Sequence, residues 1–144
     1  MAKSRQRPLS PHLSNYRWGP HMLISILHRA TGDGLAIVGG LGLTWWLYAA
    51  ANGAASYANF MYYVWAAGAG DMVGLIANVI ARIVLVGLSW AFFQHLFSGL
   101  RHLVMDMGAG YELQANGRWS KIIIAASLIA TVLLWAYLLL GSAH

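Results

Sequence analysis

The chain has 144 residues, of which 59% are hydrophobic and only 9% are charged, whereas about 25% of the residues of an ordinary soluble domain are charged. No charged residue occurs from Gly34 to Gly70, which excludes an ordinary soluble fold and indicates a membrane protein, and the absence of cysteine excludes disulfides, thiolate metal sites and cysteine nucleophiles. The net charge of +5 does not indicate a nucleic-acid partner, because the basic residues lie at the ends of apolar runs and form no patch with interleaved readout groups.

The N-terminal region is polar over residues 1–20 and contains prolines. It has neither the apolar core of a secretion signal nor the long amphipathic character of an organelle transit peptide. We therefore expect a mature, cytoplasmic N-terminal segment over 1–20, followed by a transmembrane domain over 21–144.

Three apolar runs follow, each long enough to cross a bilayer, which takes about 20 helical residues. Measured from their basic flanks, the first run continues from Arg29, the second ends at Arg101 and the third starts after Lys121. The sequence thus predicts an all-α membrane protein with three transmembrane helices, at about 21–51, 72–104 and 120–142. Between the first two, SYANFMYYVWAAG (56–68) predicts a short interfacial helix.

The distribution of basic residues predicts the orientation, because positively charged segments stay on the cytoplasmic side. The first loop has no lysine or arginine, whereas the N-terminal region and the second loop contain Lys3, Arg5, Arg7, Arg17, Arg29, Arg101, Arg118 and Lys121. We therefore expect the N-terminus and the second loop to be cytoplasmic. Arg82 is the exception, and we expect it to extend to the outer headgroup level.

His95 lies inside the second run, six residues before Arg101, or about 9 Å below the membrane boundary. An ionisable residue at that depth is costly and usually functional. Neutral imidazole is a ligand of haem iron, and a backbone carbonyl can fix its other N–H group. Gly99 on the same face would leave room for a porphyrin edge, and His102 returns to that face about 10.5 Å further on. The alternative is that His95 only hydrogen-bonds to a neighbouring helix.

A second group of polar residues opens the first run. Ser25 and Arg29 are four residues apart on one helix face, where their hydroxyl and guanidinium groups could bind a carbonyl ligand with a lipid tail. They could equally anchor lipid headgroups, or Arg29 could simply end the apolar run. Two basic pairs also lie at one depth on two helices, a pocket for haem carboxylates if these helices pack together: His28, Arg29, Arg101 and His102.

The motifs in these segments resemble those of a known family. They are RPLSPHL at 7–13, YR at 16–17, SILHRATG at 25–32 and HLFSGLRHLVMD at 95–106. In order and spacing the chain resembles the cytochrome b membrane-anchor subunit of succinate dehydrogenase. The resemblance implies that this chain packs with a second anchor subunit and shares a haem b with it, each chain supplying one axial histidine.

The resemblance also implies roles for individual residues. His95 would be the iron ligand of this chain, and Ser25 and Arg29, with Trp18 more loosely, would line a ubiquinone site. Residues beside the haem propionates would be His28, Arg29 and His102.

As a whole, the resemblance implies a non-catalytic subunit of an enzyme complex in the bacterial inner membrane, rather than the mitochondrial one. A flavoprotein subunit and an iron-sulfur subunit would deliver electrons from succinate to ubiquinone. Two alternatives stay open: a structural anchor without haem, and the anchor of a fumarate reductase working in the opposite direction.

Overall fold

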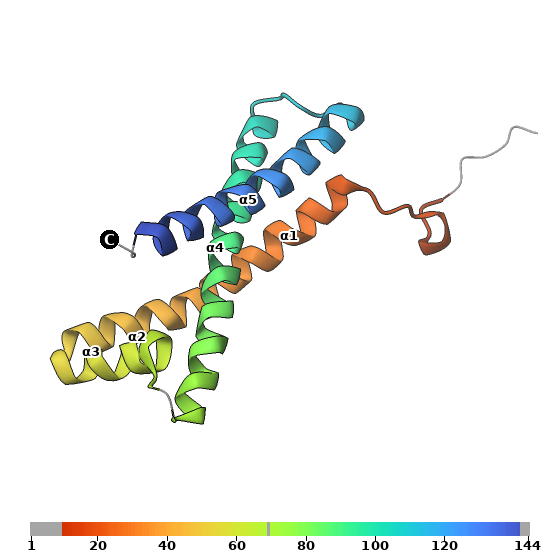
Figure 1. The fold of residues 1–144 in the computed structure, drawn as a ribbon. Helices are drawn as coiled ribbons and strands as arrows, with labels where there is room; N and C mark the ends of the chain where they lie inside the picture. Colours follow the sequence, from red (N-terminus) through yellow and green to blue (C-terminus); the bar gives the residue numbers. More distant parts are fainter. Residues whose placement is uncertain (1–9, 69, 142–144) are drawn as a thin grey trace, which may run out of the picture.

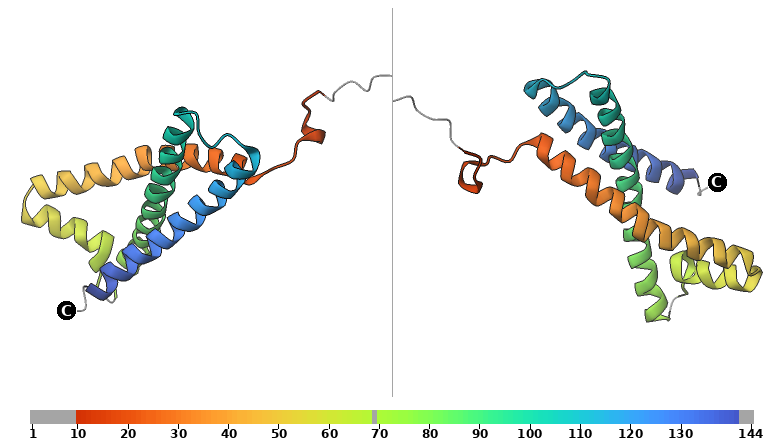
Figure 2. Two further views of the ribbon diagram at one scale, coloured as in Figure 1. Left: turned by 90° about the horizontal axis from the view of Figure 1, so that it is seen from above. Right: turned by 180° about the vertical axis from the view of Figure 1, so that it is seen from behind.

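The computed structural model describes residues 10–68 and 70–141. In this part of the chain all regular secondary structure is helical, and there is no strand. The elements are η1 (Leu13–Asn15), α1 (Pro20–Gly34), η2 (Leu35–Gly39), α2 (Gly40–Ala51), α3 (Ala54–Met61), η3 (Tyr62–Ala66), α4 (Met72–Asp106) and α5 (Leu113–Gly141). Three long rods dominate the fold, namely α1 with α2, then α4, then α5, while α3 folds back beside the end of α2 (Figures 1 and 2).

The first rod is one helix of 32 residues, from Pro20 to Ala51. Pro20 stands at its start, where a proline costs nothing because the first N–H groups of a helix have no partner. Its middle, Leu35–Gly39, is a π-helical segment through which the backbone stays right-handed and helical. Such segments occur mostly as single turns inside α-helices. The hydrogen-bond pairing of the backbone therefore changes over this segment, but the helix continues through it.

The connection to the second rod is helical over Ala54–Ala66, which agrees with the short helix predicted at 56–68. Asn78 of α4, which is buried, holds this connection in place. Its Nδ2 donates to the carbonyl oxygens of Tyr62 (2.7 Å) and Tyr63 (2.8 Å), and its Oδ1 accepts from the backbone N–H of Ala67 (2.9 Å). One side chain thus satisfies three backbone groups that have left regular helical pairing.

Arg82 lies one turn further along α4. Its Nη2 donates to the Trp65 carbonyl oxygen at 3.0 Å, and its guanidinium carbon lies 4.7 Å from the centre of the Trp65 ring. The contact combines a hydrogen bond with a cation–π interaction. Arg82 therefore has a definite partner in the connection between α2 and α4.

Asp71 caps the start of α4. Its Oδ1 accepts from the backbone N–H of Val73 at 3.1 Å, and its Oδ2 accepts from the Tyr62 hydroxyl. The hydrogen bond from Tyr62, followed by that from the backbone of Gly74, holds the pKa of Asp71 below its ordinary value. The same bond raises the pKa of Tyr62, because it favours the protonated phenol.

The turn between α4 and α5 depends on two glycines. Gly108 (φ +87°) and Gly110 (φ +79°) have left-handed backbones, which favour glycine. α5 then begins at Leu113, seven residues before the expected start near 120. Hydropathy registers only the apolar part of a helix, whereas the backbone helix includes the polar turns ahead of it.

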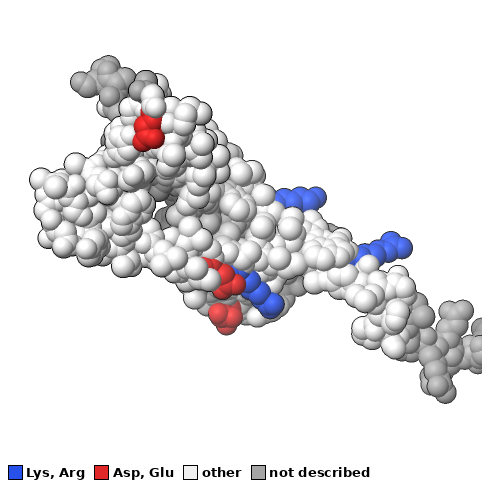
Figure 3. Space-filling view, turned by 90° about the horizontal axis from the view of Figure 1, so that it is seen from below, with Lys and Arg blue, Asp and Glu red and all other residues white. Residues whose placement is uncertain are grey.

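The interior consists mainly of small and polar residues, and large apolar side chains cover the outside. The buried polar residues are Thr31, Asn78, Gln94, Ser98, Ser120, Ser127 and Thr131. This pattern suits helix packing in lipid, where small residues allow close approach and the hydrocarbon accepts the apolar surface. The face drawn in Figure 3 carries few charged side chains.

Three helices have the length and composition to cross a membrane: Pro20–Ala51, Met72–Asp106 and Leu113–Gly141. The predicted all-α fold with three such helices is therefore confirmed. The basic residues Lys3, Arg5 and Arg7 used for the orientation lie outside the described residues.

Candidate functional site

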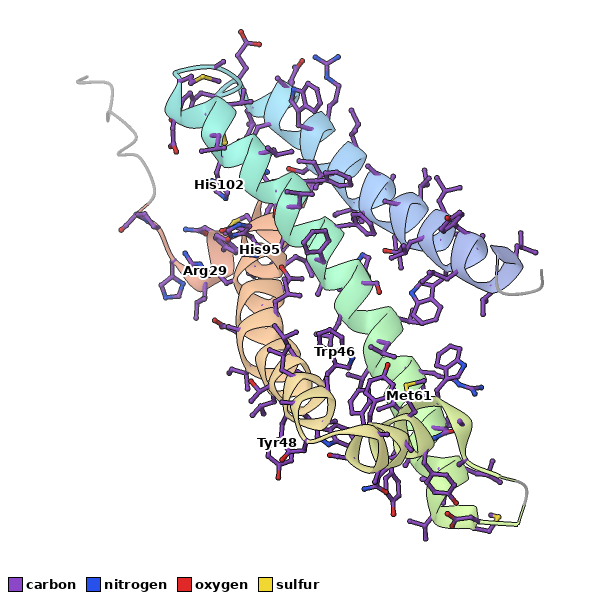
Figure 4. The ribbon with its side chains drawn as sticks, turned by 90° about the vertical axis from the view of Figure 1, so that its left-hand side faces the viewer. Arg29, Trp46, Tyr48, Met61, His95 and His102 are labelled. Carbon is purple, nitrogen blue, oxygen red and sulfur yellow. The ribbon has the colours of Figure 1, made fainter. Side chains whose placement is uncertain are left out.

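Three histidines meet where α1 crosses α4. The ring of His28 on α1 is stacked on that of His95 on α4, with centroids 4.1 Å apart and planes 12° apart. His102, two turns further along α4, approaches the edge of His28 at a centroid distance of 5.1 Å. Figure 4 shows His95 and His102 on the side of α4 that faces α1, with Arg29 at the same end of the helices. The structure thus brings three of the predicted site residues together.

The hydrogen bonds of His95 define its protonation. Its Nδ1 lies 3.0 Å from the carbonyl oxygen of His28 and 3.5 Å from Thr31 Oγ1. A carbonyl oxygen only accepts, so Nδ1 must carry the proton and donate it. The lone pair of a neutral ring is then on Nε2, which has no hydrogen-bond partner among the described residues. This is the arrangement in which an imidazole can bind a metal through Nε2.

Gly99 and Arg101 have different neighbours. A Cβ atom at Gly99 would lie 3.8 Å from Nε2 of His28, so this glycine belongs to the histidine cluster. Arg101 is half-buried, and its Nη2 donates to Asn116 Oδ1 on α5. The structure therefore does not bring Arg101 into the cluster.

The three predicted quinone residues lie near the beginning of α1. Ser25 is half-buried and Arg29 is exposed one turn later. The guanidinium of Arg29 makes no hydrogen bond or ion pair within the described part of the chain. Trp18, in the segment before α1, is 68% exposed and touches the ring of Tyr16 edge-on at 6.2 Å. Ser25 and Arg29 thus share a helix, whereas Trp18 approaches from the preceding segment.

Thr31 and Gly32 both contact His95, although the sequence pattern gives neither residue a role. Thr31 is buried, and its hydroxyl lies 2.6 Å from the Leu27 carbonyl oxygen. A Cβ atom at Gly32 would lie only 2.9 Å from Cε1 of His95. Both residues stand in the quoted stretch SILHRATG, but nothing in their type alone indicates a contact with α4.

Two apolar hollows lie between other parts of the helices. One, of about 740 Å³, lies between α2, η3 and α4 and is lined in part by Gly42, Trp46 and Leu88. The other, of about 510 Å³, lies between α4 and α5 and includes Arg101 and Trp119 in its lining. Neither hollow is lined by His95.

A metal ion held by this chain alone would need several donors together. Among the described residues, no three histidine, aspartate or glutamate side chains are grouped so that they could hold one ion. The geometry instead offers one imidazole nitrogen. It fits an iron whose remaining ligands come from a porphyrin and from another chain.

Comparisons with known proteins place the chain in a family. Residues 3–134 match the family described as succinate dehydrogenase/fumarate reductase transmembrane subunit. The chain is 37% identical to the succinate dehydrogenase cytochrome b556 subunit of Paracoccus denitrificans over 129 residues, 88% of each chain. It is 34% identical to the subunit of that name from Rickettsia felis, over 94% of this chain and 99% of the relative. The cytochrome b560 subunit of Reclinomonas americana is 29% identical over 90% of this chain and 84% of its own.

These matches span nearly the whole chain, including both histidine segments, and the fold supplies the three membrane-spanning helices that such a subunit needs. The chain therefore belongs to the succinate dehydrogenase/fumarate reductase transmembrane subunit family and is a multi-pass membrane anchor of a complex of that class.

Proposed function

We propose that this chain is the haem b-binding anchor of a succinate:quinone oxidoreductase and forms part of its quinone-reduction site. One observation carries the proposal: Nδ1 of His95 is committed to the His28 carbonyl oxygen, which leaves Nε2 free for iron. Relatives named cytochrome b556 support a haem in this family. The other complex members would be a second small anchor subunit, an iron-sulfur subunit and a flavoprotein subunit.

The residues around His95 fit a haem. His95 would bind the iron through Nε2, and the second anchor subunit would supply a further ligand. His28 and His102, which lie against each other at a centroid distance of 5.1 Å, would donate hydrogen bonds to the propionates. Gly99 would keep the adjacent surface flat. When bound, the haem supplies a one-electron redox centre beside the quinone site.

Arg29 and Arg101 differ in how available their guanidinium groups are for a haem propionate. Arg29 is exposed and unpaired within the described residues, so its guanidinium is free for an anionic or carbonyl group. Arg101 already donates to Asn116. It would need its remaining N–H groups to reach a propionate, and this makes it the weaker candidate of the two.

The quinone would bind beside the beginning of α1. The Ser25 hydroxyl would donate a hydrogen bond to one quinone carbonyl oxygen. Arg29 would stabilise the negative charge that develops on a quinone oxygen as electrons arrive from the iron-sulfur subunit. Trp18, whose ring is largely exposed, would cover the quinone ring from the preceding segment.

The basic residues support an orientation with the N-terminus and the α4–α5 turn in the cytoplasm. The relatives from Paracoccus and Rickettsia support the bacterial inner membrane as the location. The matched family also includes fumarate reductase subunits. The direction of electron flow would then follow from the potential of the quinone in the host.

A reduced-minus-oxidised absorption spectrum of the purified complex tests the haem assignment. We expect a low-spin haem b spectrum in the wild type, its loss in His95→Ala, and its retention in His12→Ala. His12 is exposed and contacts Ser14, far from the cluster, which makes it a matched control. An unchanged spectrum in His95→Ala would reject the ligand assignment, and a wild-type complex without haem would favour a purely structural anchor.

A further inference from the structure

We propose that Thr31 and Gly32 are positioning residues for His95: the Thr31 hydroxyl shares the Nδ1 proton with the His28 carbonyl, and Gly32 leaves the space that the ring edge occupies. The inference rests on the proposed function, in which Nε2 of His95 binds the haem iron. It concerns residues of this chain to which neither the motif nor the family gives a role here.

The hydroxyl of Thr31 can only accept from His95. Its single proton is directed to the carbonyl oxygen of Leu27 at 2.6 Å, the shorter of its two contacts with α1 carbonyls. The oxygen of Thr31 then presents a lone pair to Nδ1 at 3.5 Å. Because Thr31 is buried, water does not compete for this position. The hydroxyl therefore reinforces the same tautomer that the His28 carbonyl selects.

Gly32 determines how close the ring can come to α1. A Cβ atom there would lie 2.9 Å from Cε1 and 3.3 Å from Nδ1 of His95, but 3.9 Å from Nε2. Separations near 3 Å are well inside van der Waals contact for carbon atoms. The edge that bears Nδ1 is thus pressed against the bare backbone of Gly32. Nε2 is the ring nitrogen further from it.

Helix geometry explains why these groups act together. His28, Thr31 and Gly32 stand at i, i+3 and i+4, so they lie on one face of α1. That face offers the His95 imidazole on α4 a carbonyl oxygen, a hydroxyl oxygen and the space left by the missing side chain of Gly32. No charge is involved, so the arrangement avoids the cost of an ion inside a membrane. These three groups together fix both the rotation and the tautomer of the His95 ring.

The hydrogen bond is tested with Thr31→Val, which keeps the shape of the side chain but lacks the hydroxyl. Loss of an acceptor from Nδ1–H makes the imidazole a poorer donor to iron, so we expect haem affinity to fall by about tenfold and the haem midpoint potential to rise. Thr31→Ser should restore both values. Thr44→Val is the matched control, because Thr44 also donates to a carbonyl of its own helix, that of Gly40, but is exposed and far from His95.

The space is tested with Gly32→Ala. We expect the haem content per purified complex to fall by about tenfold or more, while a gel still shows all subunits in their normal ratio. Gly34→Ala is the control on the same helix, because a Cβ atom there meets nothing within 4 Å. If Gly32→Ala fails to assemble, the Thr31 series decides the question, since valine and threonine have nearly the same shape.

The outcomes separate this inference from the proposed function. Suppose that the wild type contains haem and that His95→Ala loses it. Unchanged haem affinity and midpoint potential in Thr31→Val, together with unchanged haem content in Gly32→Ala, would then overturn the roles of Thr31 and Gly32 but not the proposed function. An unaltered haem spectrum in His95→Ala would overturn the ligand assignment on which it rests. The positioning role is supported if the haem midpoint potential rises in Thr31→Val, returns to the wild-type value in Thr31→Ser and does not change in Thr44→Val.

Discussion

Removing the guanidinium of Arg29 should impair quinone reduction without disturbing the fold. Arg29 is exposed and makes no hydrogen bond or ion pair within the described residues, so Arg29→Ala leaves no buried group of this chain without a partner. The loss is then the interaction with the quinone. A hydrogen bond to a charged group contributes about 1.5–3 kcal/mol, which corresponds to a decrease in kcat/KM for quinone of about 10- to 150-fold.

The assay compares two activities of the same purified complex. Succinate-dependent quinone reduction should fall by that factor, whereas succinate oxidation with a soluble dye, which bypasses the membrane site, should stay near the wild-type value. Arg29→Lys should be intermediate, because it keeps the charge but loses the planar fork. Arg118→Ala, which removes an exposed arginine at the start of α5, is the matched control. Equal losses in both assays, or an equal effect of Arg118→Ala, would refute the quinone role of Arg29.

Two further predictions concern the connection between α2 and α4. Asn78→Leu removes three hydrogen bonds to the backbone of Tyr62, Tyr63 and Ala67, so it should lower the free energy of unfolding by about 3 kcal/mol. The loss should appear as a lower unfolding midpoint in detergent. An unchanged midpoint would contradict the role of Asn78. The lowered pKa of Asp71 means that the unfolded chain binds more protons in the acid range, so this contribution to stability is present above the ordinary pKa of 3.8 and is lost as the pH falls through the folded pKa. The raised pKa of Tyr62 gives a contribution that is lost as the pH rises beyond about 10. Tyr62→Phe should therefore unfold at a lower temperature than the wild type at neutral pH and converge with it in acid, and a difference that does not vary with pH would count against the bond.

Much of the fold could be predicted because hydropathy and helix length are local properties. The three spans follow from runs such as IIIAASLIATVLLWAYLLL after Lys121, which cannot be placed elsewhere than in lipid. The early start of α5 at Leu113 could not be predicted in this way, because its first turns are polar. The π-helical segment Leu35–Gly39 leaves no mark in hydropathy either, since it depends on how the backbone pairs.

The candidate site was predictable to the extent that spacing along one helix determines it. His95, Gly99 and His102 fall on one face of α4, and the structure places all three toward α1. The partners across the two helices were not predictable, because they depend on the crossing point. His28 contributes its backbone carbonyl to His95 as well as its ring, a role that no side-chain pattern reveals.

Arg101 shows that closeness in the sequence can also predict a contact that the structure does not form. Its place next to His102 in the sequence suggested a shared pocket, but adjacent residues of a helix point about 100° apart. The structure accordingly directs Arg101 to Asn116 on α5. Packing, rather than sequence proximity, therefore decides which basic residues share an environment.

Whether His95 binds haem iron is tested most directly by an experimental density map of the intact complex, at a resolution that separates the ring atoms of His95. We predict a haem iron bound to Nε2 of His95, with a further ligand from the second anchor subunit and with Nδ1 of His95 within hydrogen-bond distance of the His28 carbonyl oxygen. A map in which His95 contacts only protein, and any haem lies on other residues, would contradict it.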